Sequence, residues 1–415
     1  MIYTRFNGML SRSKAPAVAV ACGERSSGQR VNFALPLAAL LALSSGGVSF
    51  AQVTGHSANV EQVTQAAKVQ AYWTSQRLAS AKTLTLVPQL GVDGLPAAAS
   101  STRPAAAATS ANGKGSLPLV AAQPSAQQQL VQPSDLAQAA ENLAVDTMLA
   151  TQGQNIPLAS SSYGAFFTTN RVSPDAATTT YPYSTIGKLF FTDPRTGGNF
   201  VCSASVLRPR IIATAGHCVT KPSTSAAGRY FYTNFLFVPA YRNGVAPFGS
   251  FTPSIEWVTN TWYFSDGSVP NPQDVAIIVA RDTTSKLGYI TGWLGWRTNG
   301  LPANNLLVGG YPCNLDSCAR MEQTWAQIFA FGGNNTYTVG SAMRGGASGG
   351  PWIQDFGVAP VGAPAGELAL NYLVGVTSYG PVSTTPQYLG ASNFDSDFVN
   401  LLNSACGAAT SGNCN

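Results

Sequence analysis

The stretch Arg344–Trp352, RGGASGGPW, places Ser348 among four glycines. Within it, Gly346–Gly350 fits the pattern G-x-S-x-G, in which a sharp turn exposes a nucleophilic serine. Two unrelated fold classes carry such a serine, one an α/β fold and one an all-β fold. The position of the histidine along the chain distinguishes them, because each fold assembles its catalytic groups in its own chain order.

The order of the histidines excludes the first of these classes. The chain has two histidines, His56 and His217, and both precede Ser348. The α/β-hydrolase fold requires a histidine that follows the serine and the acid. A triad of that kind therefore cannot be completed from this sequence.

Short apolar runs predict an all-β domain over residues 166–415. Runs such as IGKLFFT (Ile186–Thr192) are cut by Gly, Pro, Asn and Asp, and they do not alternate with helical segments. This pattern is typical of an antiparallel sandwich or barrel, and the length is sufficient for two small barrels. The run FDSDFVNLLNSA predicts a C-terminal helix, with Asp395 or Ser396 as its N-cap.

Residues 1–51 predict a secretory signal with an extended basic region. The apolar run FALPLAALLAL (Phe33–Leu43) has the length of a signal core, and the small residues Ser49 and Ala51 precede the expected cleavage point at Gln52. A membrane anchor or a core helix is the alternative, although the run is short for a bilayer span. We therefore expect a secreted protein, extracellular or periplasmic.

Residues 52–165 are expected to form a pro-segment or linker. They are rich in Ala, Gln, Ser and Thr and contain no cysteine. Two stretches predict helices, residues 59–80 and residues 134–153, which begin at Asn59 and Ser134. The Pro/Ala/Ser-rich sequence between them argues against a packed core there. A small helical binding domain is the alternative.

The charge distribution argues against a nucleic-acid partner. The formal net charge is +5, but residues 1–51 alone hold five basic side chains against one acidic. From residue 160 onward we count 13 basic and 12 acidic side chains. The body of the protein therefore lacks the basic stripe that binding to phosphates requires.

Six cysteines lie outside the leader, and an even set in an exported chain predicts disulfides. Their order favours three local pairs: Cys202–Cys218, Cys313–Cys318 and Cys406–Cys414. Zinc is the alternative, which is disfavoured because the chain has two histidines and no C-x-x-C. We expect no metal and no cofactor.

His217 and Asp274 are the candidates for a base and its orienting acid. His217 lies in ATAGHCV, next to Cys218, and it is the one histidine of the predicted β-domain. A lone histidine is more often structural, but here it precedes an acid and a serine in the order His–Asp–Ser. Asp274 begins the apolar run DVAIIVA, where its carboxylate can reach inward to an imidazole, although a simple turn residue is the alternative. Asp266 and Asp282 have the sequence context of turns.

The glycines around Ser348 allow a backbone conformation that can bind an oxyanion. A tetrahedral intermediate requires two backbone N–H groups that point at one oxyanion. The loop that brings together the amides of Gly346 and Ser348 needs backbone angles that glycine adopts readily. These two residues are therefore the candidates for an oxyanion hole.

With these motifs the sequence resembles the chymotrypsin-like serine peptidases, in particular the bacterial branch that contains the staphylococcal glutamyl endopeptidase. The resemblance covers the chain from about Tyr181 to the end. It is carried by YPYSTIGKLFFT, CSASVL, TAGHC, DVAIIV, GGYP, GGASGGPW and GVTSYG. It implies two six-stranded antiparallel β-barrels with a C-terminal helix.

The resemblance also implies roles for single residues. It makes Ser348 the nucleophile, His217 the general base and acid, and Asp274 the residue that orients the histidine. The substrate backbone would pair with TSYG, which comprises Thr377, Ser378, Tyr379 and Gly380.

Three departures from the family pattern bear on activation and specificity. Ala347 stands where animal relatives have the aspartate that receives a new N-terminus on activation, so a pro-segment would act by blocking or by assisting folding. Thr377 stands where the glutamyl enzymes have a histidine, and Arg344 replaces a pocket cysteine. We expect a preference for small or apolar side chains, and processing near Arg171–Val172.

The sequence therefore predicts a secreted, monomeric serine endopeptidase made as a precursor. Its partners would be protein or peptide substrates, with no nucleic acid and, in the mature form, no membrane. The alternative is a non-catalytic secreted binding module, such as an adhesin, on the same fold.

Overall fold

The computed structural model describes ten stretches of the chain: residues 53–57, 62–88, 111–121, 128–139, 166–301, 305–333, 335–357, 371–383, 387–407 and 412–415. All of them fall in one compact unit, Phe50–Asn415. The signal predicted over residues 1–51 lies outside the described residues. Within the described stretches, no helix is both long and apolar enough to cross a membrane.

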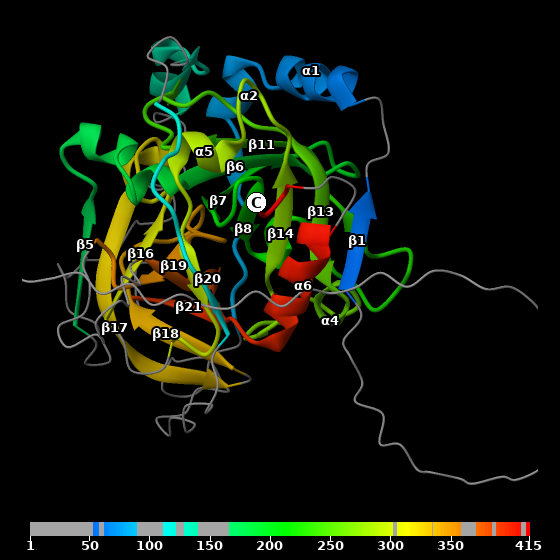
Figure 1. Cartoon of the computed structure of the whole chain (residues 1–415), viewed down its shortest axis with the longest axis vertical. Helices are drawn as coiled ribbons and strands as arrows, with labels where there is room; N and C mark the ends of the chain where they lie inside the picture. Colours follow the sequence, from blue (N-terminus) through cyan, green and yellow to red (C-terminus); the bar gives the residue numbers. More distant parts are fainter. Residues whose placement is uncertain are drawn as a thin grey trace, which may run out of the picture. The chain divides into compact units, whose positions relative to one another are not determined.

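The first half of the β-domain forms a six-stranded antiparallel barrel (Figure 1). Its strands, in spatial order, are β13 (Pro253–Thr259), β14 (Ala276–Ala280), β8 (Ile211–Thr214), β7 (Asn199–Val206), β6 (Ile186–Thr192) and β11 (Thr233–Pro239). Phe237 and Phe251 exchange two backbone hydrogen bonds of 2.8 Å, which join β11 to the segment that enters β13. These bonds close the barrel.

The second half forms another barrel of six antiparallel strands. In spatial order they are β19 (Pro351–Gln354), β16 (Asn305–Gly310), β17 (Glu322–Gly333), β18 (Thr336–Gly340), β21 (Tyr388–Asn393) and β20 (Tyr372–Tyr379). The pairing of β19 with β20 closes this barrel. The predicted all-β architecture of two six-stranded barrels is therefore confirmed.

Closure explains why the apolar runs of the sequence do not alternate strictly. All positions of β6 and of β14 are buried, because each barrel packs one face on its own interior and the other on neighbouring elements. Aromatic side chains dominate the first interior, where Phe191 stacks on Tyr232 with ring centroids 4.9 Å apart.

The remaining elements are short and lie around the barrels. They are β9 (Thr220–Lys221), β10 (Tyr230–Phe231), β12 (Val245–Ala246), β15 (Gly295–Arg297), α4 (Asn260–Tyr263), α5 (Leu287–Thr291), and the 3-10 helices η2 (Asp175–Thr179), η3 (Tyr183–Thr185), η4 (Gly216–Cys218) and η5 (Asp316–Cys318).

Strands from the N-terminal region pair with the β-domain. β1 (Val53–Ser57) pairs with β13 and β2 (Lys82–Thr83) with β7 in the first sheet, and β3 (Asn112–Gly113) pairs with β15 in the second. β4 (Gln128–Gln129) forms a separate two-stranded sheet with β12, and β5 (Phe167–Arg171), at the start of the β-domain, pairs with β17. Residues 52–165, which we expected as a region distinct from 166–415, thus contribute backbone pairing to the same compact unit. Composition alone could not show this, because the pairing partners lie far away along the chain.

The first of the two helices predicted at the N-terminal side is divided in two. The stretch 59–80 forms α1 (Gln62–Tyr72) and α2 (Ser75–Ala79), and the second begins at Thr74, whose Oγ1 accepts a hydrogen bond from Arg77 N at 3.3 Å. Asn59, the expected cap, lies outside the described residues. In the second stretch, residues 133–139 are helical and the part beyond 139 is not described.

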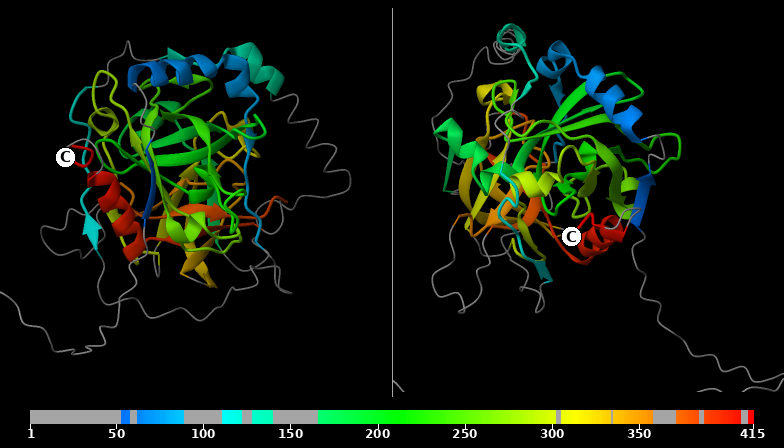
Figure 2. Two further views of the ribbon diagram at one scale, coloured as in Figure 1. Left: turned by 90° about the vertical axis from the view of Figure 1, so that its right-hand side faces the viewer. Right: turned by 45° about the horizontal axis from the view of Figure 1, so that its top comes forward.

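These helices pack on the first barrel rather than standing free. The side chain of Trp73 is 6% exposed, donates from Nε1 to Asn234 O at 2.6 Å and contacts the ring of Phe190 with centroids 5.5 Å apart. Leu78 is buried beside it. Figure 2 shows α1 lying across the green strands of this barrel.

The predicted C-terminal helix is α6 (Ser396–Gly407). Asp395 is its cap, since Oδ1 accepts from Asp397 N at 2.9 Å and from Phe398 N at 3.4 Å. Phe398, Leu401 and Leu402 are buried against the first barrel.

One buried acid makes the stability of this fold depend on pH. Burial of Glu256 on β13 raises the pKa of its carboxyl from 4.5 to about 7. The folded state therefore favours the protonated carboxyl. Its contribution to stability is complete below pH 4.5 and is lost as the pH rises to about 7.

We predict that Glu256→Gln raises the free energy of unfolding at pH 8 by up to about 3 kcal/mol more than it does at pH 4, because the glutamine carries no charge at either pH. Urea unfolding at both pH values measures the difference. An equal effect of the substitution at pH 4 and pH 8 would contradict the assignment.

Candidate active site

His217 and Asp274, predicted as a pair, are in direct contact. His217 lies in η4, directly after β8, and Asp274 precedes β14, the strand paired with β8. Asp274 Oδ2 is 2.8 Å from His217 Nδ1, and Asp274 Oδ1 accepts from His217 N at 2.8 Å. Asp274 is 0% exposed and His217 2%. The carboxylate thus holds both the backbone and the ring of the histidine.

This pairing determines what the imidazole can do. With Nδ1–H donated to Asp274, the neutral ring presents an unprotonated Nε2. Nε2 is buried and has no hydrogen-bond partner within the described stretches. It is therefore free to take a proton.

A third donor to Asp274 comes from the other barrel. Ser378, on β20, donates from Oγ to Asp274 Oδ2 at 2.5 Å. Sequence reasoning placed Ser378 in the substrate strand but missed this contact, because residues 104 positions apart meet only in the fold. The bond connects the two barrels at the site.

Ser348 lies on the loop between β18 and β19, and the first barrel holds this loop. Ser203 N donates to Ser348 O at 2.7 Å, and Ser203 Oγ donates to Gly346 O at 2.8 Å. Ser348 is 5% exposed, and its Oγ donates to Leu84 O at 3.2 Å. Sequence reasoning missed both contacts, because the motif CSASVL that contains Ser203 indicated only the fold, and Leu84 belongs to no motif.

The glycines of this loop are required by close packing. Gly346 and Gly349 have φ values of +96° and +74°. A Cβ at Gly349 would overlap Thr214 Oγ1 and lie 2.5 Å from Ser203 O and 2.9 Å from Ala215 N. The loop therefore presses against the end of β8, two residues before His217.

We predict that Gly349→Ala reduces stability and disrupts the site. A left-handed alanine costs roughly 1–2 kcal/mol of backbone strain, and here the overlap with Thr214 adds to it. Gly197→Ala is the matched control, because Gly197 has φ +71° but nothing within 4 Å of the added Cβ. Melting temperatures of both variants measure the difference, and equal losses would contradict the packing argument.

The predicted substrate strand has mixed roles. Thr377 N donates to Gly350 O at 2.9 Å, and Thr377 O accepts from Gly349 N at 2.7 Å. The Oγ1 of Thr377 accepts from Trp352 Nε1 at 2.9 Å. Tyr379 is buried, with its hydroxyl 3.2 Å from Thr336 Oγ1. Gly380 N donates to Leu86 O at 3.2 Å. Thr377 thus supports the loop that carries Ser348, whereas Gly380 pairs with Leu86.

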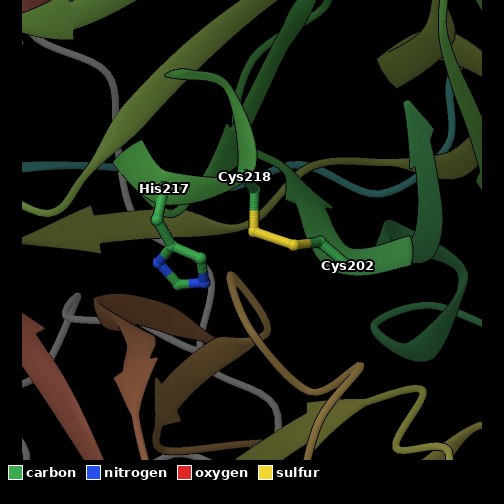
Figure 3. A group of neighbouring side chains, drawn as sticks. All are labelled: Cys202, His217 and Cys218. Atoms are coloured by element: carbon green, nitrogen blue, oxygen red, sulfur yellow. A yellow bond between two sulfur atoms is a disulfide. The ribbon is translucent and has the colours of Figure 1, made fainter. Parts of the chain in front are cut away.

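The three local disulfides of the sequence analysis form. Cys202 joins Cys218, Cys313 joins Cys318, and Cys406 joins Cys414. Figure 3 shows the first of these beside His217. Cys202, His217 and Cys218 lie close enough together to suggest metal ligands. The two sulfurs are bonded to each other, and His217 Nδ1 faces Asp274, so this group does not offer a metal a set of thiolates.

Arg344, which replaces a pocket cysteine of the family, is buried. It donates from Nε to Ser383 O at 2.6 Å and from one terminal nitrogen to the carbonyls of Ser341 and Met343. Burial lowers the pKa of its guanidinium to about 10. Arg344 therefore connects the loop that carries Ser348 to the segment after β20.

The expected processing point lies in a stretch whose backbone is paired although most of its side chains are exposed. Arg171 ends β5, which pairs with β17, and its exposed side chain forms an ion pair with Asp316. Val172 is 2% exposed and its N donates to Met321 O at 3.0 Å. The polar sequence TTNRVSPDA is thus exposed along most of its length, as its composition suggests, while Val172 itself is buried.

Comparisons with known proteins point to proteases. No family model matches the chain. It is 25% identical over 146 residues to an extracellular metalloprotease of Bacillus subtilis (strain 168), a match that covers 34% of this chain and 42% of that protein. The match thus spans less than half the length of that relative.

Similar solved structures include three proteases. The protease Anisep from Arthrobacter nicotinovorans is 26% identical with a TM-score of 0.43, covering 53% of this chain and 94% of that one. A thermostable serine protease from an extremophilic microorganism is 23% identical with a TM-score of 0.47, covering 57% and 100%. A Glu endopeptidase is 20% identical with a TM-score of 0.43, covering 57% and 95%.

The chain resembles a chymotrypsin-like serine peptidase. Its two barrels and its C-terminal helix have the arrangement which that resemblance implies.

Proposed function

We propose that this protein is a serine endopeptidase that hydrolyses peptide bonds through an acyl-enzyme. The observation that carries the proposal is the buried pair of His217 and Asp274, with Nε2 of the histidine free. The glycine-flanked Ser348 lies on a loop that packs at Ala215, two residues before His217. A buried, oriented imidazole that can reach such a serine is the arrangement that activates a hydroxyl nucleophile.

In the proposed mechanism, His217 Nε2 takes the proton of Ser348 Oγ as the oxygen attacks the substrate carbonyl. The oxyanion forms at the backbone N–H groups of Gly346 and Ser348. His217 then donates the proton to the departing amine, and an acyl ester on Ser348 remains. His217 then takes a proton from water as the water oxygen attacks this ester. The bond between the acyl carbon and Ser348 Oγ breaks, His217 returns the proton to Ser348 Oγ, and the acid is released.

Asp274 would stabilise the imidazolium that forms in both steps. The carboxylate stays fixed because Ser378 Oγ and His217 N bind it as well. A fixed charge needs no reorganisation when the proton moves, and this lowers the barrier.

The proposed setting is a secreted monomer that acts on proteins or peptides after its signal is removed. Three disulfides support an oxidising compartment, in which such bonds persist. The nearly equal numbers of acidic and basic side chains from residue 160 onward fit a partner that is not nucleic acid.

We predict that Ser348→Ala, His217→Ala and the double variant lose peptidase activity by about the same factor, of the order of 10⁴-fold or more, because the residues act as a unit. Hydrolysis of casein and covalent labelling by a fluorophosphonate probe measure this, on the full chain and after limited proteolysis. Peptide mapping should place the label on Ser348.

Ser205→Ala is the matched control, since Ser205 is a fully buried serine of β7 and should keep labelling and activity. Folded protein that never reacts at Ser348, before or after limited proteolysis, would refute the proposal. It would favour the non-catalytic binding module.

A further inference from the structure

Residues 82–88, KTLTLVP, lie across the candidate active site and contact both barrels. We call them the cleft segment. They follow α2 and run past β7 toward β20 (Figure 1). Three sets of contacts hold them, one at each barrel and one at Ser348.

The first contact is strand pairing with the first barrel. Lys82 and Thr83 form β2, which pairs parallel with β7 at Phe200 and Val201, next to Cys202. Gly345, in the loop before Ser348, has no side chain and so leaves room for Thr83 and Thr85 of the segment. A Cβ on Gly345 would lie 2.8 Å from both Cβ and Oγ1 of Thr83 and would overlap Thr85 Oγ1.

The second contact is with the nucleophile itself. Leu84 O accepts the hydrogen bond of Ser348 Oγ at 3.2 Å. The hydroxyl proton therefore points to a carbonyl of the same chain, while His217 Nε2 has no partner within the described stretches. In this state the base and the nucleophile are not joined by the hydrogen bond that catalysis requires.

The third contact is with the second barrel. Leu86 O accepts from Gly380 N at 3.2 Å, at the end of the strand expected to pair with substrate. The Leu86 side chain packs against a small apolar cluster of Val269, Tyr379 and Tyr388. Backbone pairing and an apolar contact are the two means by which sheet edges bind extended peptides.

The cleft segment is also anchored on its N-terminal side. Trp73 and Leu78 are buried in the core of the first barrel, and Tyr72 donates from its hydroxyl to Asn199 Oδ1 at 2.9 Å. Because the anchor lies only a few residues before Lys82, the local concentration of the segment at the site is high.

We propose that the cleft segment is a built-in inhibitor that keeps the uncut chain inactive. This inference rests on the proposed peptidase function. The segment occupies the backbone groups at both rims of the site, and Leu84 O diverts the hydroxyl of Ser348 from His217. Ala347 leaves no aspartate for activation by a new N-terminus, so release of this segment is the activating step.

The segment inhibits rather than serving as substrate, because its carbonyl oxygen faces the nucleophile. Hydrolysis requires the carbonyl carbon to face Ser348 Oγ, with the oxygen at the amides of Gly346 and Ser348. Leu84 O instead accepts from the hydroxyl, so the Leu84–Thr85 bond stays intact in this arrangement.

The test compares two neighbouring substitutions in the full chain. Leu86→Asp places a charge in the apolar cluster and should release the segment, whereas Val87→Asp is the matched control, since Val87 is 52% exposed. The readout is the rate at which a fluorophosphonate probe labels Ser348, with intact mass proving that the chain is uncut.

We expect slow labelling of the unsubstituted chain and of Val87→Asp. Leu86→Asp should react about ten times faster, the factor that corresponds to the loss of one partly buried leucine contact. Thr85→Trp is the second variant, in case Leu86→Asp does not fold. It should also accelerate labelling, because Thr85 lies directly against Gly345.

The outcomes separate the two proposals. If the uncut, unsubstituted chain reacts as fast as folded Leu86→Asp or Thr85→Trp, the inhibitor is refuted while the nucleophile stands. A fragment that begins at Thr85 would likewise overturn it, since the segment would then be a substrate. If no variant and no proteolysed sample reacts at Ser348, the peptidase proposal fails, and the inhibitor fails with it.

Discussion

The buried carboxylate of Asp274 is the constraint on which the site depends. A charge with no exposure is tolerated in a protein interior only when its oxygens are hydrogen-bonded. Here the donors are the backbone and ring of His217, from the first barrel, and Ser378 Oγ, from the second. Satisfying one carboxylate therefore brings together groups from both barrels, and it sets the tautomer of the imidazole at the same time.

The loop that carries Ser348 is also held by hydrogen bonds from both barrels. Its backbone is held by Ser203 from the first barrel and by Thr377 from the second. Gly349 lets the loop approach Thr214 more closely than any side chain would allow. Both barrels are thus needed to build a site that neither contains alone. Sites often lie between two rigid units, because rigid elements hold side chains in a fixed geometry.

The N-terminal region has a different relation to the fold than its composition suggests. Its few large apolar residues, such as Trp73 and Leu78, enter the core of the first barrel and carry the neighbouring segment to Ser348. An anchored extended segment of this kind can cover the Ser348 hydroxyl without a separate chain.

The sequence by itself determined the all-β class, the local disulfide pairs, the C-terminal helix and the candidates His217, Asp274 and Ser348. These predictions depend on the spacing of apolar residues, on the short separations of the paired cysteines and on the order of residues along the chain, all of which can be read directly from the sequence. Only the tertiary structure decided that Ser378 completes the environment of Asp274, that Thr377 supports the loop that carries Ser348, that Val172 is buried and that Leu84 reaches Ser348. Each of these is a contact between residues far apart in the chain. Such residues meet only when the barrels close, so neither the composition nor the local pattern of the sequence predicts these contacts.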